Sequence, residues 1–304
     1  MIDTGTSALT RRIVHPGPIT PERFRAIGCH VHPVALAASP GLSVNEAIGE
    51  AFAQLGFEGG YVRLKNVPMK RLHYVMPAAA PDDTHAAWYS ETFSMPGGII
   101  LDAGLHMGRR DGKPFLHCHG SWRSADGIVS MGHLLPFESE FAGETPLEAL
   151  ALDGAILDVQ KDEETNFPLF TPIARPRSRV ASGLRALLCT VRPNTDICTA
   201  IETAAAQFGL RETEVDGIGS LIGADYDDGT SLTAYASEIL IRDGRIGRSS
   251  VGHDQATLDI SMVDLTKHIS GGRLVRGKNP VCVTFELLMT ERQAPGHLTR
   301  ADQH

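Results

Sequence analysis

Three histidines have the spacing of a metal site. His117 and His119 lie two residues apart, and His133 follows after a turn. Because alternate residues of a β-strand point to the same face of a sheet, the first two imidazoles are neighbours. The stretch 124–127 ends in Gly127 and predicts a hairpin with a three-residue loop, which sets His133 opposite His119, whereas a two-residue loop would turn it away. Opposed residues have Cβ atoms about 4.5–5.5 Å apart, so three imidazoles would converge.

Three neutral imidazoles and an open position are the ligand set of a catalytic zinc site. Imidazole also suits copper, iron and nickel, so the pattern predicts a divalent metal, with zinc as the first choice. The alternative is that these are ordinary half-buried sheet histidines with hydrogen-bond partners. A third histidine in the matching register favours the metal.

Four further residues are candidates for chemistry near this metal. His106, in a glycine-flanked stretch before the histidine strand, and Glu91, in a Ser-Glu pair, could serve in acid–base catalysis. For Glu91 the alternative is a structural role, because Glu238 follows a serine in the same way later in the chain. Arg109, Arg110, Lys113 and Arg123 crowd the same region. Of these, Arg109 and Arg123 are the candidates to hold a substrate carboxylate, although solvated surface charges are the alternative. The expected ligand is a small anionic molecule.

The elements that must position these side chains occur twice. Residues 47–57 match residues 200–210 without a gap. In each copy a helix is predicted to begin after a polar residue, Ser43 or Asp196, and to end at a glycine. Alternating and β-branched runs with glycine turns surround both helices and are typical of antiparallel strands.

We therefore predict an α+β fold of two tandem domains, each a mostly antiparallel sheet with one or two helices. The predicted segments are a first domain with insertions and the histidine site (1–170), a linker (171–183), a second domain (184–291) and a flexible tail (292–304). In the second copy, alignment places Asp259, Ser261 and Arg273 where the first has its histidines. We expect the second domain to lack the metal and to have a structural or substrate-shaping role.

Composition excludes several classes of function. The five cysteines have no paired spacing and the chain does not begin like a signal peptide, which predicts a reduced, cytoplasmic protein. No apolar run approaches the ~18–20 residues needed to cross a bilayer, so no membrane association is expected. A formal charge of −8 disfavours non-specific binding to nucleic acid.

The ordered motifs resemble the PPC (plant and prokaryote conserved) domain. The residues that carry the resemblance are the helix region from Pro40 to Gly56, Ser90-Glu91, His117-x-His119, Gly132-His133-Leu134 and Glu148, with counterparts in the second copy that include Ser237-Glu238 and Glu286. The resemblance implies a compact antiparallel sheet, homo-oligomeric assembly of the kind seen in trimeric single-domain members, and a metal held by His117, His119 and His133.

Two interpretations of function follow. The first is a metal-dependent enzyme, such as a hydrolase or lyase, that acts on a small anionic metabolite by metal-activated water or metal-polarised carbonyl chemistry. The second is a non-catalytic DNA-binding or regulatory protein with a structural metal. Plant members of the family carry a basic AT-hook, but the basic run from Arg175 to Arg179 lacks its glycine.

Overall fold

The computed structural model describes residues 11–177, 183–248, 252 and 254–292, and these residues are mostly in β-strands. In chain order, the elements are β1 (Phe24–Ala38), α1 (Val44–Gln54), β2 (Gly60–Val75), β3 (Pro77–Ala78), β4 (Trp88–Tyr89), β5 (Phe93–Pro96), β6 (Ile99–Arg110), β7 (Lys113–Arg123), β8 (Val129–Leu134), β9 (Glu140–Phe141), β10 (Thr145–Asp153), β11 (Ala155–Lys161), β12 (Pro168–Ala174), β13 (Leu184–Val191), α2 (Ile197–Phe208), β14 (Thr213–Leu221), β15 (Ala224–Asp225), β16 (Ser231–Leu232), β17 (Ser237–Arg248), β18 (Asp254–Asp264), β19 (Ile269–Arg273) and β20 (Val281–Glu291). Neither helix has the length and hydrophobicity that crossing a membrane requires.

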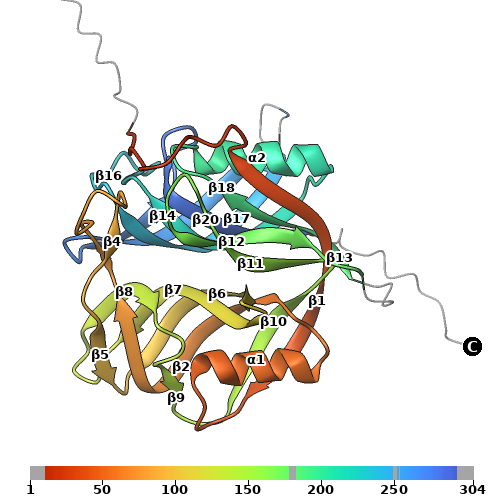
Figure 1. Ribbon diagram of the computed structural model, residues 1–304, viewed down its shortest axis with the longest axis vertical. Coiled ribbons are helices and arrows are strands. Elements are labelled where there is room, and N and C mark those ends of the chain that lie inside the picture. The colour runs from red at the N-terminus through yellow and green to blue at the C-terminus, as the bar shows by residue number, and fades with distance from the viewer. Residues whose placement is uncertain (1–10, 178–182, 249–251, 253, 293–304) are drawn as a thin grey trace, which may run out of the picture.

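One long strand joins the two halves of the molecule. The beginning of β1 pairs with β13, and the rest of β1 pairs with β10. In Figure 1, β1 accordingly runs along one side of the molecule between two layers of strands. We call residues 11–177 the first half and residues 183–292 the second half. A single 16-stranded sheet therefore crosses the boundary that the sequence predicted between two domains.

The same order of strand pairing occurs in both halves. In the first half the order is β1, β10, β2, β6, β7, β8. In the second it is β13, β20, β14, β17, β18, β19. This recurrence agrees with the repeat in the sequence, and the predicted β-rich, mostly antiparallel arrangement is confirmed. Among the described residues each half has one helix, where one or two were predicted. That each half is a separate domain remains a prediction.

The predicted linker differs from the structure. Residues 168–174 form β12, which pairs with β11 and is part of the large sheet. Of the rest of the predicted linker, residues 178–182 lie outside the described residues, as do residues 293–304 of the predicted tail.

Both helices begin and end where their capping residues predict. Ser43 caps α1, with its Oγ accepting a hydrogen bond from the backbone N–H of Glu46 while the Glu46 carboxylate accepts one from the N–H of Ser43. Asp196 caps α2 with a single bond, its carboxylate accepting from the N–H of Thr199 at 2.9 Å, and Gly209 ends the helix with a φ of 67°. These bonds satisfy amides that have no partner inside the helix.

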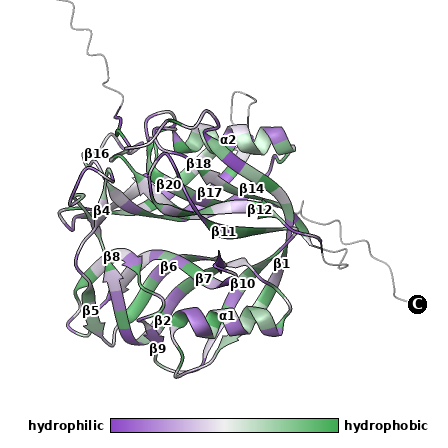
Figure 2. Ribbon diagram, in the orientation of Figure 1, coloured by the Kyte–Doolittle hydropathy of each residue, from purple (hydrophilic) through white to green (hydrophobic). Residues whose placement is uncertain are grey.

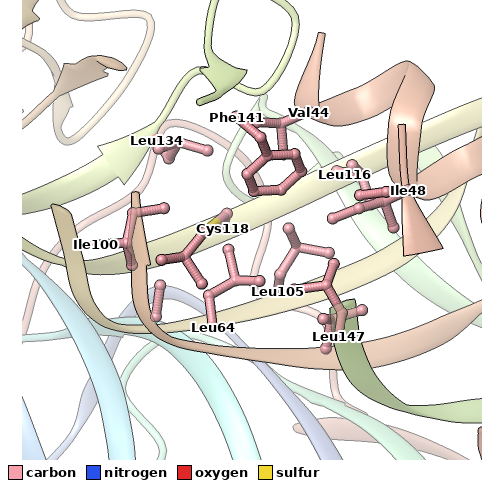
Figure 3. Close-up of a cluster of buried hydrophobic side chains, with 14 of the residues drawn as sticks. Val44, Ile48, Leu64, Ile100, Leu105, Leu116, Cys118, Leu134, Phe141 and Leu147 are labelled. Carbon is pink, nitrogen blue, oxygen red and sulfur yellow. The ribbon is translucent and has the colours of Figure 1, made fainter. Parts of the chain in front are cut away.

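The buried face of α1 packs on the sheet of the first half. Figure 3 shows Ile48 beside Leu116, and both helix residues Val44 and Ile48 above Leu64 and Leu105. Hydrophobic and hydrophilic residues are interspersed along the strands in Figure 2. Strands such as β1 and β10 alternate between a buried and a more exposed face, whereas β13 and β20 are buried on both faces. Burying a leucine or valine side chain contributes about 1.5–3 kcal/mol, so this cluster is a main source of stability.

The two halves also pack directly against each other. Ile218, Leu240 and Val263 of the second half belong to the hydrophobic core of the first. Gly104 on β6 allows this close approach, since a Cβ atom there would lie 2.3 Å from the Tyr61 hydroxyl oxygen and 2.8 Å from a Leu240 methyl group. Side chains of the second half can therefore reach the strands that carry the histidines.

Candidate metal centre

The hairpin of β7 and β8 has the predicted register. His119 lies directly opposite His133. The Ser124 N–H donates to the Ile128 carbonyl at 3.0 Å, so residues 125–127 form a three-residue loop, and Gly127 is left-handed with a φ of 88°. The prediction from the turn sequence is confirmed.

The three imidazoles converge. One nitrogen of each of His117, His119 and His133 lies within 4.8 Å of the other two. The Nε2 atoms of His117 and His119 are 2.9 Å apart, and the ring of His133 is centred 4.8 Å from that of His117 and 5.4 Å from that of His119. His119 is buried and the other two are partly buried.

Two carboxylates from the second half complete the cluster. Glu238, at the start of β17, places its Oε2 2.8 Å from Nε2 of His119. Glu286, on β20, places its Oε2 2.7 Å from Nδ1 of His117. Both glutamates are buried. The sequence comparison of the two copies singled out both residues, but it assigned neither to the site.

The hydrogen bonds fix which nitrogens can bind a cation. Nδ1 of His119 donates to the Ile239 carbonyl at 3.0 Å, and Nδ1 of His117 faces the Glu286 carboxylate. In the neutral ring this leaves the lone pair on Nε2 of each histidine. Nε2 of His117 and a Glu238 oxygen then both lie within 2.9 Å of Nε2 of His119. In addition, Nδ1 of His133 is buried without a hydrogen-bond partner among the described residues. A cation is the group that this excess of lone pairs fits.

Burial and neighbouring charges perturb the pKa values of the cluster. Burial lowers the pKa of His117 to about 3 and that of His133 well below its usual value, which keeps both rings neutral as a metal ligand must be. Burial acts in the same direction on His119, but the adjacent Glu238 carboxylate outweighs it and raises the pKa. Burial also raises the pKa of Glu286 to about 7.

The histidines lie in a pocket of about 300 Å³ that both halves line. Glu238, Glu286 and Ser220 come from the second half. Aromatic side chains of the first half form much of the remaining wall, together with the single arginine Arg110. The sequence grouped this arginine with Arg109 and Arg123, but the two predicted substrate-binding residues were its neighbours in that group.

The other predicted site residues lie elsewhere. His106 is fully buried on β6, opposite His117, where its Nε2 donates to the Glu286 carbonyl at 3.2 Å, and burial lowers its pKa to about 4. Glu91 is exposed and lines a different pocket, beside Lys267. Arg109 forms an ion pair with Glu58, and Arg123 is exposed at the far end of β7. None of these four side chains lines the pocket that contains the three histidines.

The predicted alignment of the second copy needs a correction. In the hairpin of β18 and β19, Arg273 lies opposite Asp259, and Gly271 lies opposite Ser261. The residue that faces Ser261, as His133 faces His119, is therefore a glycine. The sequence alignment matched the glycine and leucine that flank Arg273 to those that flank His133. The strand pairing differs because the second hairpin is shorter than the first on both strands.

The chain was compared with known proteins. No protein-family model and no curated protein matches it. Among solved structures, it is similar to a metal-containing protein from Archaeoglobus fulgidus (20% identity, 47% of this chain, 94% of that chain, TM-score 0.36) and a PPC protein from Pyrococcus horikoshii (15%, 51%, 99%, 0.35). A candidate DNA-binding protein from Ralstonia eutropha also matches (14%, 46%, 89%, 0.32). At these values, the resemblance to the PPC domain stays a prediction.

Proposed function

We propose that this protein is a metal-dependent enzyme that binds one divalent cation, zinc in the first place, and acts on a small anionic molecule. The observation that carries the proposal is the convergence on Nε2 of His119, where Nε2 of His117 and Oε2 of Glu238 both lie within 2.9 Å. Like lone pairs repel at this distance unless a proton or a cation lies between them. A cation can bind all three of these atoms at once.

The residues have separate roles in this proposal. His117, His119 and His133 are the nitrogen ligands, and Glu238 adds an oxygen ligand from the second half. Glu286 and the Ile239 carbonyl hold the rings of His117 and His119 through their Nδ1 atoms, as carboxylate and carbonyl partners do for metal-bound histidines.

When bound, the cation would polarise a substrate carbonyl or lower the pKa of a water molecule. The ligand atoms border a pocket rather than a closed core, which supports catalysis over a purely structural metal. The aromatic walls exclude water from one side of the site. We also propose, as the family resemblance implies, that chains assemble into a homo-oligomer.

The alternative of a DNA-binding protein has less support. Glu238 and Glu286 give the pocket an acidic floor, and the formal charge of −8 would repel a polyanion. Within the predicted basic run, Ser178 and Arg179 lie outside the described residues.

Elemental mass spectrometry on protein purified without a histidine tag tests the proposal. The wild type is compared with a variant in which His117, His119 and His133 are all changed to Ala. A matched control carries the same change at His73, His85 and His268, which lie outside the cluster. We expect about one metal ion per chain in the wild type and the control, and none in the site variant.

Circular dichroism and thermal melting check that all three proteins are folded. Absence of metal from the wild type, also after incubation with zinc, overturns the proposal. So does full retention of metal in the folded site variant.

A further inference from the structure

Aromatic side chains line the pocket above the histidines, and of these Phe167 and Phe170 are largely buried. Phe115 and Phe170 meet edge to face with ring centroids 5.7 Å apart, and Phe170 lies 6.4 Å from the ring of His117. Trp88 and Phe167 stack at 5.5 Å on the same wall. Trp88 keeps 38% of its surface exposed, and Phe115 is only partly buried. Such a wall suits a flat apolar group of a ligand.

Arg110 is the only lysine or arginine among the described residues that line this pocket. Its guanidinium lies over the ring of Phe115, 5.5 Å from the ring centre. No carboxylate of the described residues forms an ion pair with it, whereas the neighbouring Arg109 is paired with Glu58. The planar fork of Arg110 is therefore available to hold a carboxylate by two parallel hydrogen bonds.

The strand register sets the spacing between this arginine and the histidines. Arg110 pairs with Lys113 at one end of the β6–β7 hairpin, and His106 pairs with His117 farther along the same ladder. At about 3.3 Å per residue, the backbone positions of Arg110 and His106 are ~13 Å apart, and the Arg110 guanidinium extends back over Phe115 between them. Phe115 lies halfway, on the same face of β7 as His117. A ligand that spans both ends thus has room for one ring between its acid group and its reacting group.

From these observations we propose that the pocket binds a carboxylic acid that carries an aromatic ring. The acid group pairs with Arg110, the ring packs on Phe115 and Phe170, and the reacting group lies at the histidines. This inference rests on the function proposed above for the histidine end, and it adds the substrate class and the residue that selects it.

Isothermal titration calorimetry with 3-phenylpropanoate tests this inference. The comparison ligands are 3-phenylpropanamide, which has the ring without the charge, and propanoate, which has the charge without the ring. We expect the ring-bearing acid to bind about tenfold or more tightly than either. Arg110→Met should remove this preference of acid over amide. Arg109→Met, a matched change one residue away, should leave it intact.

Metal content is measured on the same samples, so that the two proposals can fail separately. Metal without any binding of 3-phenylpropanoate overturns the inference and leaves the proposed function standing. Binding of the acid by protein that takes up no metal overturns the function and leaves the pocket assignment standing. Equal affinity for acid and amide, or an acid preference that survives Arg110→Met, also overturns the inference.

Discussion

The two halves contain the same hairpin with different chemistry. The β7–β8 and β18–β19 hairpins both close with a three-residue loop whose last residue has a positive φ, Gly127 at 88° and Lys267 at 69°. Only the first carries imidazoles on the face that meets the other half. In the second, Asp259 pairs with Arg242 instead. The scaffold alone therefore does not create the site.

The glutamates show the opposite difference. Glu91 and Glu148 of the first half are exposed. Their sequence counterparts in the second half, Glu238 and Glu286, are buried against the histidines. One half supplies the nitrogen atoms and the other supplies the carboxylates, so the candidate centre is composite. The second half therefore contributes to the candidate metal centre although its own hairpin has no histidines at the matching positions.

Glu238→Gln is the most direct way to break this comparison. The change keeps the size of the side chain and removes its charge, so we expect the metal dissociation constant to rise about 10–100-fold. Competition against a chromophoric chelator measures it. Glu91→Gln, the same change at the first-half counterpart, should leave the constant unchanged. Equal affinities in wild type and Glu238→Gln would mean that the second half contributes no ligand.

Asp216→Asn probes the contact between the halves. Arg63 of the first half bonds Asp102 and donates to the Ile241 carbonyl of the second half at 2.8 Å, and the partly buried Asp216 lies near this arginine. Burial raises the pKa of Asp216 from 3.8 to about 6. The folded protein therefore holds a proton that the unfolded chain releases, and this group's contribution to stability is lost as the pH rises from about 4 to about 6.

The asparagine variant cannot ionise and lacks this loss. We expect its free energy of unfolding, relative to wild type, to increase by an order of 1 kcal/mol between about pH 4 and about pH 7.5. Urea denaturation at both pH values measures the change. Asp243→Asn, at an exposed carboxylate on β17, should give a curve parallel to that of the wild type. A parallel curve for Asp216→Asn as well would contradict the prediction.

Local patterns in the sequence predicted the local features of the structure. Capping residues and glycines placed both helices, and the turn at 124–127 placed His133 opposite His119. The turn Asp111-Gly112 carried a comparable signal, because this pair favours a two-residue hairpin that sets Arg110 opposite Lys113. This turn signal could have predicted that Arg110 lies on the face of the sheet that carries the histidines. Arg109 would then point to the opposite face, because adjacent residues of a strand face opposite sides.

Contacts between distant segments had no such local signal. Glu238 and Glu286 reach the histidines because β1 joins both halves into one sheet that folds back on itself. Nothing in the spacing of these residues records that arrangement. The prediction for His106 failed for the same reason. This residue lies on the same face of the sheet as the site histidines, but the Glu286 carbonyl of the second half covers it and keeps it out of the pocket.

Gly127→Ala tests what the loop contributes to the first hairpin. No atom lies within 4 Å of the position that a Cβ would occupy, so the cost comes from the left-handed backbone alone. We expect a loss of about 1 kcal/mol in the free energy of unfolding, measured by urea denaturation. Gly143→Ala is the control, because its surroundings are equally open and its φ is not positive. Equal stability of the two variants would show that Gly127 is not needed for the turn.

Arg273→His is the smallest expected effect and the sharpest test of the register. Sequence alignment places this residue where the first half has His133, so alignment alone would expect the change to begin a second metal site. In the structure the new imidazole would lie opposite Asp259, which Arg242 already holds, and neither Ser261 nor Gly271 can replace the missing histidines. We expect that Arg273→His adds no bound zinc, whether it is made in the wild type or in the variant that lacks the three site histidines. Because the latter has no background metal, one added zinc ion per chain there would show that the scaffold needs only a single imidazole, and that the composite site is not the reason for the difference between the halves.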